Sequence, residues 1–511
     1  MLKTSELDIH PSQRKQKNYT FLEVTRSLCP TCEKPIDAKL LLKNDQIIMT
    51  KWCPEHGHFK CLIHSDAAWY FEAQKYHRPG DIPLKYSSEM KLGCPYDCGV
   101  CPDHEQHICL GLLDITENCN MNCPTCFAAS GKGGKHMSME DIEGCLDRFV
   151  ELEGPGGVIQ LSGGEPTTHP QFLDIVKLAL TKPYDIVMIN TNGLILAKDT
   201  ELVKQLAEIG ENRLEIYLQF DSLESKAYEI LRGEDLLAEK HLALQNCLDV
   251  GLPVNLIATV ARGVNEDQVG PLVELGIKTK GIRGVNFQPV SYAGRHSKFD
   301  PMDRMTLTEV MHGIETQTEG TFKVSDFLPL PCSHPSQIAM TYAYTKNGKV
   351  KPIPRYIDLK PYMDYFTNTV YPDPRPIFLD AVKGLWSAGT SMSSAKTLYD
   401  FSCVCGMPVK KDFFTSKGRA KIADEDAFRI VILQFQDVWN WDMKIAKKCC
   451  VGFIQPDGRI IPFDTHNIFY RENGGSLGHN SENQSSSPED MGGSGSKTEP
   501  ELTEVSGSNL G

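Results

Sequence analysis

The middle of the chain, from Leu110 to Pro289, alternates buried strands with helices, and this alternation restricts the fold more than any other feature. Helical spacing of apolar residues is clearest over Met139–Leu152, which Ser138 caps. Six strand–helix units in series predict a parallel sheet, curved or closed, with its chemistry at the carboxyl ends of the strands. The six predicted strands are Leu110–Ile115, Gly157–Leu161, Asp185–Ile189, Leu214–Phe220, Pro253–Val260 and Gly284–Pro289.

Three cysteines follow the first predicted strand at the spacing C-x3-C-x2-C, namely Cys119, Cys123 and Cys126. Three thiolates can hold three corners of a [4Fe–4S] cluster and leave the fourth iron without a protein ligand. A zinc knuckle would need a fourth Cys or His. The loop resembles that of the radical S-adenosylmethionine (SAM) family. This resemblance implies that SAM chelates the open iron and is cleaved to a 5′-deoxyadenosyl radical.

Polar and glycine-rich segments end several of the other predicted strands, beginning with Ser162-Gly163-Gly164-Glu165-Pro166 after the second. Two glycines allow a backbone to approach a ligand closely. At each polar strand end the alternative is simple turn or capping chemistry. The radical SAM resemblance implies a partial (βα)6 barrel. It also implies SAM contacts at Gly163, Gly164, Glu165, Pro166, Asn190, Asn192, Gln219, Asp221 and Gln288.

Near the N-terminus, two cysteine turns flank a predicted hairpin centred on Lys43-Asn44-Asp45. This pattern is similar to a rubredoxin or zinc ribbon and predicts one mononuclear iron or zinc site. His56 and Cys61 are alternatives for the fourth ligand, and we favour His56 because Cys-x-x-His repeats the spacing of the first turn. The predicted ligands are Cys29, Cys32, Cys53 and His56.

Two further cysteine groups predict auxiliary clusters, so that we expect two to three [4Fe–4S] clusters in all. The first group lies within sixteen residues and can close every corner of a cluster, with zinc as the alternative. The second is scattered, and scattered cysteines can instead be core residues. The first group is Cys94, Cys98, Cys101 and Cys109, and the second is drawn from Cys332, Cys405, Cys449 and Cys450.

Composition narrows the function classes. The chain of 511 residues carries a formal net charge of −13, which argues against a nucleic-acid partner. No signal peptide and no apolar run long enough to cross a bilayer is evident, so we expect a cytoplasmic protein, at most peripheral to a membrane. Eighteen cysteines in such a chain favour metal sites over disulfides.

The predicted architecture is α/β, with a C-terminal α+β auxiliary-cluster region. Its parts are an N-terminal arm (1–25), a rubredoxin-like knuckle (26–70), an auxiliary-cluster segment (85–110), the radical SAM (βα)6 barrel (111–320), a C-terminal substrate and auxiliary-cluster region (321–470) and a disordered tail (474–511).

The order of the motifs resembles the tetraether lipid synthase family of archaea across roughly residues 26–470. The motifs are the knuckle, CPYDCGVCPDHEQHIC, CNMNCPTCFAAS, LSGGEPTTHP, PCSHP and CCVGFIQPDGRIIPF. This resemblance implies an enzyme that couples the terminal methyl carbons of isoprenoid chains on archaeal diether lipids. It also implies an electron donor such as ferredoxin. We identify no catalytic residue beyond the cluster ligands.

Two other functions stay open. One is a radical SAM methylase that acts on a pterin cofactor precursor, a role associated with similar sequences. The other is a non-catalytic iron–sulfur protein that transfers electrons, although such a protein would not need the Gly163-Gly164-Glu165-Pro166 segment.

Overall fold

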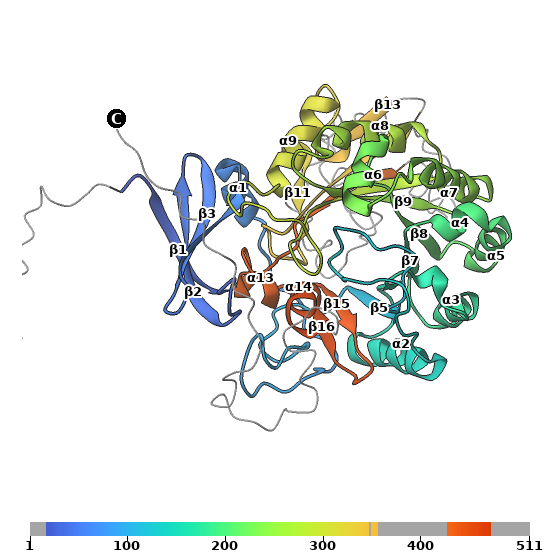
Figure 1. The fold of residues 1–511 in the computed structure, drawn as a ribbon, viewed down its shortest axis with the longest axis horizontal. Helices are drawn as coiled ribbons and strands as arrows, with labels where there is room; N and C mark the ends of the chain where they lie inside the picture. Colours follow the sequence, from blue (N-terminus) through green and yellow to red (C-terminus); the bar gives the residue numbers. More distant parts are fainter. Residues whose placement is uncertain (1–16, 347–348, 356–426, 472–511) are drawn as a thin grey trace, which may run out of the picture.

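The computed structural model describes residues 17–346, 349–355 and 427–471 (Figure 1). The N-terminal ribbon is an antiparallel sheet in the order β1-β2-β3-β4, and helix α1 (Ala67–Gln74) follows it. Asn44 and Asp45 both have positive φ, 50° and 58°, as a two-residue hairpin turn requires. The predicted hairpin is therefore confirmed. The ribbon strands are β1 (Thr20–Leu28), β2 (Pro35–Lys43), β3 (Gln46–Cys53) and β4 (Gly57–His64).

The six predicted strand–helix units form neighbouring parallel strands in chain order, which confirms the predicted α/β fold. The strands are β5 (Leu110–Thr116), β6 (Val158–Gly163), β7 (Ile186–Thr191), β8 (Leu214–Gln219), β9 (Val254–Val260) and β10 (Ile282–Pro289). The helices between and after them are α2 (Met139–Glu153), α3 (Phe172–Thr181), α4 (Leu194–Lys198), α5 (Thr200–Gly210), α6 (Ser225–Arg232), α7 (Leu237–Asp249), α8 (Val269–Lys278) and α9 (Leu307–Gln317).

The C-terminal region is not a separate unit, because its strands extend both edges of the same sheet. Strand β14 (Ala427–Leu433) runs parallel to β10, and β15 (Val451–Ile454) runs parallel to β5. Antiparallel strands complete the edges and give a 12-stranded sheet over the described residues. These are β11 (Leu328–Pro329), β12 (Ile338–Lys346), β13 (Lys349–Pro352) and β16 (Ile460–Pro462), and the short helices α13 (Met443–Lys447) and α14 (Phe463–Thr465) flank the C-terminal hairpin.

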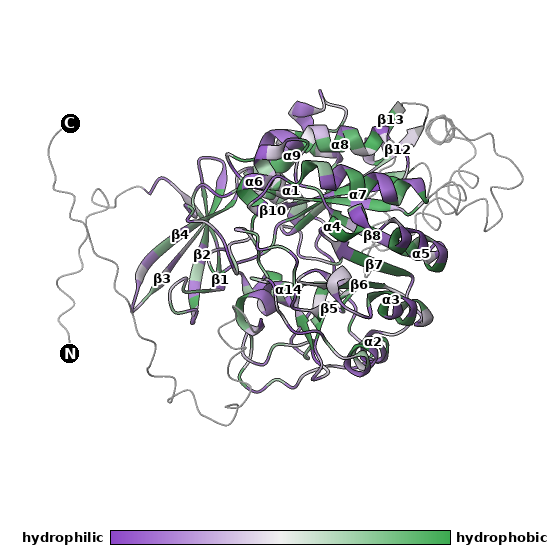
Figure 2. Ribbon diagram, turned by 45° about the vertical axis from the view of Figure 1, so that its right-hand side comes forward, coloured by the Kyte–Doolittle hydropathy of each residue, from purple (hydrophilic) through white to green (hydrophobic). Residues whose placement is uncertain are grey.

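Side-chain alternation divides the barrel into two environments. On β8, Ile216 and Leu218 belong to the apolar core beneath the helices, so Glu215, Tyr217 and Gln219 face the inside. The outer helices carry both hydrophilic and hydrophobic residues, as helices with one solvated face do (Figure 2). Among the described residues, no helix has the length and apolarity needed to cross a membrane.

Buried polar contacts fix the ribbon to the barrel. Lys51 on β3 donates hydrogen bonds to the carbonyl oxygens of Val438 and Trp439, both at 2.9 Å. Beneath them, Arg304 and Asp437 form a fully buried ion pair at 2.8 Å. The Arg304 guanidinium lowers the pKa of Asp437 against the opposing effect of burial. The ribbon metal site is therefore attached to the barrel through the segment that follows β14.

We expect Asp437→Asn to destabilise the protein by about 3–5 kcal/mol, because it leaves the Arg304 charge buried without its partner. Urea unfolding of the two forms measures this loss. Glu274→Gln, which removes an exposed ion pair to Lys278 on α8, is the matched control and should change the midpoint little. Equal midpoints for Asp437→Asn and wild type would contradict the assignment.

Candidate functional site

The three-cysteine loop begins directly after β5, at the carboxyl ends of the parallel strands. Cys119 and Cys123 are buried, and Cys126 is half-buried. Burial raises the pKa of the Cys119 thiol to about 12, and the charges of Glu165 and the two other cysteines add to the rise. Cluster binding at this loop must therefore displace protons from its thiols.

The glycines after β6 bring two loops into direct backbone contact. A Cβ at Gly163, whose φ is +136°, would lie 2.1 Å from the carbonyl oxygen of Thr116. A Cβ at Gly164 would lie 2.5 Å from the carbonyl oxygen of Asn118. The backbone N–H of Glu165 donates to that same oxygen at 2.9 Å. These glycines are thus needed for the approach of the cysteine loop itself, a role that the sequence analysis did not foresee.

Glu165 links the ends of β6 and β7 through its buried carboxylate. One oxygen accepts hydrogen bonds from the hydroxyls of Thr167 and Thr191, at 2.5 and 2.7 Å. The other accepts from the backbone N–H of Asn192 at 2.7 Å. The Asn192 amide in turn donates to Asn120, inside the cysteine loop, at 2.7 Å. Two of the predicted SAM-binding residues, Glu165 and Asn192, therefore also position the cysteine loop.

Asp221 is held by a partner that the sequence analysis missed. Both of its carboxylate oxygens accept hydrogen bonds from the Arg232 guanidinium, each at 2.7 Å, and both residues are buried. Arg232 also donates to the carbonyl oxygen of Thr125, between two of the cysteines, at 3.3 Å. The predicted contact between Asp221 and SAM stays a prediction, since the structure shows this carboxylate engaged within the protein.

Lys240 is a second missed residue. It lies fully buried on α7 and donates from Nζ to Gln219 Oε1 at 3.0 Å and to the carbonyl oxygen of Asn192. Burial lowers the pKa of Lys240 to about 8. A sequence signal existed, because Lys240 interrupts the apolar face that Leu236 and Leu244 continue at helical spacing.

The remaining predicted SAM contacts lie at neighbouring strand ends. The Asn190 amide on β7 donates to Ser162 Oγ on β6 at 3.3 Å. Gln288 lies half-buried near the end of β10, and Pro166 is buried at the start of a short 3-10 helix after β6. The structure therefore gathers the predicted residues at one end of the sheet.

The ribbon brings together the four predicted ligands of the mononuclear site. The ligand atoms of Cys29, Cys32, Cys53 and His56 all lie within 4.8 Å of one another. His56 Nδ1 is 3.6 Å from Cys29 Sγ and 3.5 Å from Cys53 Sγ, spacings that suit one tetrahedral ion. Cys61 is fully buried elsewhere, with its sulfur 3.5 Å from an Arg304 nitrogen.

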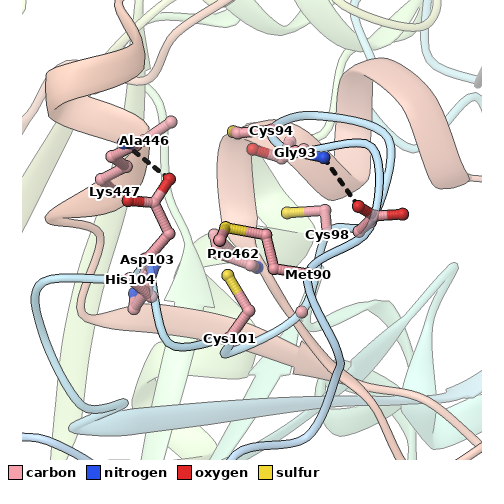
Figure 3. Close-up of a pocket in the computed structure, with 13 residues that line it drawn as sticks. Met90, Gly93, Cys94, Cys98, Cys101, Asp103, His104, Ala446, Lys447 and Pro462 are labelled. Atoms are coloured by element: carbon pink, nitrogen blue, oxygen red, sulfur yellow. Dashed lines mark hydrogen bonds and ion pairs between the residues drawn. The ribbon is translucent and has the colours of Figure 1, made fainter.

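Cys94, Cys98 and Cys101 line a pocket between residues 90–104 and residues 446–465 (Figure 3). The pocket wall includes Asp103, which forms an ion pair with Lys447 at 2.7 Å. Asp97 stabilises the loop before the cysteines, because its carboxylate accepts from the backbone N–H groups that precede Cys94. Three members of the first predicted auxiliary group thus share one pocket.

Cys109 lies in a different group from the one predicted. Its sulfur and those of Cys332 and Cys450 lie within 4.8 Å of one another, and the last two are 3.5 Å apart. The reason is strand pairing, since Cys109 and Cys450 immediately precede the paired strands β5 and β15, and the Cys109 N–H donates to the Cys450 carbonyl oxygen at 2.9 Å. Although burial opposes it, hydrogen bonds from the two neighbouring thiols lower the pKa of Cys332 to about 5.

Cys449, predicted with the third group, faces away from these three sulfurs. Its Sγ is 3.2 Å from the carbonyl oxygen of Val451, and the side chain packs with Leu112, Phe453 and Phe463. Cys450 packs instead with Cys109 and Cys332, so the two consecutive cysteines belong to different buried clusters. Cys405 lies outside the described residues.

A polar cluster crosses the inside of the barrel. Arg429 on β14 donates to Asn255 on β9 at 3.1 Å, and to Glu215 and Tyr217 on β8 at 3.3 and 3.4 Å. Strands β14 and β8 are not neighbours in the sheet, so these contacts span its concave face. The inner surface here can therefore present hydrogen-bonding groups to a polar molecule.

An apolar pocket lies beside Cys450. Its walls come from β12, β14, β15, residues adjacent to these strands, and Phe463 in α14. Phe435 and Phe463 stack at a ring-centroid distance of 4.1 Å along one wall. The lining residues are Gln337, Ile338, Leu433, Phe435, Cys449, Cys450, Val451 and Phe463.

Comparisons with known proteins agree with this geometry. Residues 113–276 match the radical SAM superfamily, and residues 21–65 match the HMPTM N-terminal zinc ribbon domain. The chain is 33% identical over 479 residues to the 7,8-dihydro-6-hydroxymethylpterin dimethyltransferase of Methanocaldococcus jannaschii, covering 88% of this chain and 94% of that protein.

Other similarities cover less of the chain. The probable GTP 3′,8-cyclase of Pyrococcus abyssi is 30% identical over 174 residues, which is 33% of this chain and 53% of that protein. The crystal structure of Streptococcus suis SuiB bound to the precursor peptide SuiA aligns over 42% of this chain and 47% of that chain, with 18% identity and a TM-score of 0.36.

Asp464 should make stability depend on pH. The carboxylate accepts from Gln436 N at 3.0 Å and from Gln337 Nε2 at 2.8 Å, and burial raises its pKa from 3.8 to about 7. Because the folded protein holds the Asp464 proton more tightly than the unfolded chain does, this proton stabilises the fold fully below about pH 4. The stabilisation is lost as the pH rises through about 7. In wild type, the free energy of unfolding should fall by on the order of a few kcal/mol as the pH rises across this range. We expect Asp464→Asn, which cannot ionise, to lack this fall, as measured by melting curves recorded at each pH.

The exposed carboxylate Asp174 on α3 supplies the control for that experiment. Asp174→Asn should keep the wild-type dependence of melting temperature on pH. An Asp464→Asn variant with an unchanged pH dependence would show that Asp464 does not titrate in this range.

Proposed function

We propose that this chain, which belongs to the radical SAM superfamily, is a radical SAM methylase that acts on a reduced pterin. The proposal has the relative from Methanocaldococcus jannaschii as its main support, because that protein is similar over nearly its whole length and is named a pterin dimethyltransferase. The sequence analysis held this function as an alternative to lipid coupling. The comparisons support the alternative better than the lipid reading.

The residues present fit the cofactors of this chemistry. Cys119, Cys123 and Cys126 would hold the SAM-binding [4Fe–4S] cluster, with the Gly163–Gly164 backbone beside it. When bound, the cluster and SAM supply a 5′-deoxyadenosyl radical that removes a hydrogen atom from a C–H bond. The protein holds the three-cysteine loop in place and keeps Cys119 and Cys123 buried away from water. It would receive one electron from a donor such as ferredoxin.

The observation that carries the choice of substrate class is the polar cluster inside the barrel. A pterin presents ring nitrogens, an amino group and a carbonyl oxygen, each of which needs a hydrogen-bonding partner when it is buried. Arg429, Asn255 and Tyr217 offer donors and acceptors on the inner face of the sheet. We propose that this face binds the pterin ring.

Coupling of lipid methyl groups is the second candidate, and the apolar pocket beside Cys450 favours it. A hydrocarbon chain would find an apolar wall in Phe435, Phe463 and Leu433. The same pocket is lined by Cys450, whose sulfur lies within 4.8 Å of those of Cys109 and Cys332, so an auxiliary cluster on these three would lie near the hydrocarbon chain. In this second candidate the lipid substrate is an archaeal diether, which the protein would approach from the membrane surface.

SAM cleavage is the first test. Protein reconstituted with iron and sulfide should release 5′-deoxyadenosine when SAM and dithionite are added, and Cys123→Ala should abolish the release because one cluster corner is lost. Cys247→Ala, at a buried cysteine on α7, should retain it. Undiminished release from Cys123→Ala would refute SAM cleavage at this loop, and a wild-type protein that releases none would favour the electron-transfer alternative.

The substrate is tested by mass spectrometry. Incubation of 7,8-dihydro-6-hydroxymethylpterin with SAM, dithionite and a one-carbon donor (a second SAM molecule or a reduced folate-type carrier) should give a product in which one or more C–H bonds have become C–CH3. Tyr217→Phe should lower its yield by several-fold by removing one inner-face hydroxyl. Diether lipid in place of the pterin should stay unchanged. A lipid product lighter by two hydrogens, with no change in the pterin, would select the second candidate.

A further inference from the structure

The segment after β10 returns to the three-cysteine loop and pairs with it. Cys126 and Arg295 form an antiparallel bridge, in which each backbone N–H donates to the other's carbonyl oxygen at 2.9 Å. The preceding Gly294 has a φ of +62°, and a Cβ there would lie 2.5 Å from the Cys126 carbonyl oxygen. The approach is therefore as close as backbone contact permits.

The Arg295 side chain then spreads over the same loop. Its Nε donates to the carbonyl oxygen of Cys123 at 3.0 Å. Its two terminal nitrogens donate to the carbonyl oxygens of Ala129 and Ser130, at 2.8 and 2.6 Å. Each branch of one planar guanidinium thus holds a different peptide group in or just after the cysteine triplet, which limits the shapes that the loop can adopt.

The charge on Arg295 is not cancelled locally. Over the described ranges, no Asp or Glu forms an ion pair with it, and its side chain donates to the uncharged carbonyl oxygens of the loop. Arg232 contacts the same loop from α6, but its charge is balanced by Asp221 at 2.7 Å. The loop therefore carries one compensated and one uncompensated arginine.

We propose that Arg295 is a positioning residue that shapes the three-cysteine loop and raises the reduction potential of the cluster it holds. Reduction adds one negative charge to the cluster, and a nearby uncompensated cation stabilises the more negative state. The thiolates that ligate the cluster carry charge of the same sign, so the cation also offsets their mutual repulsion. The inference rests on the cluster at this loop and not on the identity of the substrate.

The test is a redox titration with dithionite, followed by electron paramagnetic resonance of the cluster whose signal changes when SAM is added. Arg295→Gln should lower the ratio of reduced to oxidised cluster at a fixed potential by about tenfold, or about 59 mV for one electron. Arg295→Lys keeps the charge and should restore most of this ratio. A ratio for Arg295→Gln within twofold of wild type would overturn the electrostatic role.

Arg213 provides a matched control for loss of a carbonyl-binding arginine. It donates to the carbonyl oxygens of Leu180, Lys182 and Tyr184 at 2.6–3.1 Å, at the amino ends of the strands and thus away from the cysteine loop. Arg213→Gln should lower the melting temperature and leave the potential unchanged. An equal shift in potential from Arg213→Gln would assign the effect to general loosening and overturn the proposal.

Arg295→Gln also has a cluster-free readout. Without its three hydrogen bonds, the loop in the metal-free protein should exchange its amide hydrogens faster than in wild type, as followed by mass spectrometry of the peptide that contains Cys126. If Arg295→Gln takes up no cluster, Arg295→Lys decides the matter, and a tenfold lower ratio in that variant would overturn the proposal. No substrate enters these measurements, so failure of pterin methylation leaves their outcome intact.

Discussion

Direct contact between the backbones of Gly163–Gly164 and of Thr116–Asn118 is the constraint on which the site depends. It brings the ends of β5 and β6 so close that no side chain fits between them. Glu165 extends the contact to β7, and its partner Asn192 reaches back into the cysteine loop. The loop is therefore positioned by hydrogen bonds to the ends of three strands, and a shift of any one of them would move the thiols.

Local pattern was enough to predict the parallel sheet. Each of the six predicted strands agrees with the observed strand within about two residues at either end, because a buried strand followed by a helix leaves a clear signal in the sequence. Strands β12, β14 and β15 were not assigned to this sheet, since pairing between residues hundreds of positions apart leaves no local trace. The same limit explains why Cys109 was assigned to the wrong group. Its sequence spacing favours the Cys94 group, but the pairing of β5 with β15 places it beside Cys332 and Cys450.

The described structure contains a polar environment inside the barrel and an apolar pocket beside Cys450, and the two suit different kinds of ligand. Hydrogen-bonding side chains gather on β8, β9 and β14, while stacked aromatic rings line the pocket near Cys450. The contacts of Arg295 with the cysteine loop, like those among Cys109, Cys332 and Cys450, join residues that are far apart in the sequence. Lys240 left a periodicity signal, but the contacts of Arg295 follow only from the return of the chain after β10.

The position of β15 has a consequence for how the protein is made. This strand begins at Val451 and pairs with β5, which begins at Leu110, so one edge of the sheet stays open until nearly the whole described chain has been synthesised. Cys450 reaches Cys109 and Cys332 only at that moment. During translation, Cys109 and Cys332 are synthesised before Cys450. Until then, the nascent chain exposes the unpaired edge of β5. A metal held by all three sulfurs could therefore be bound only after Cys450 has been synthesised.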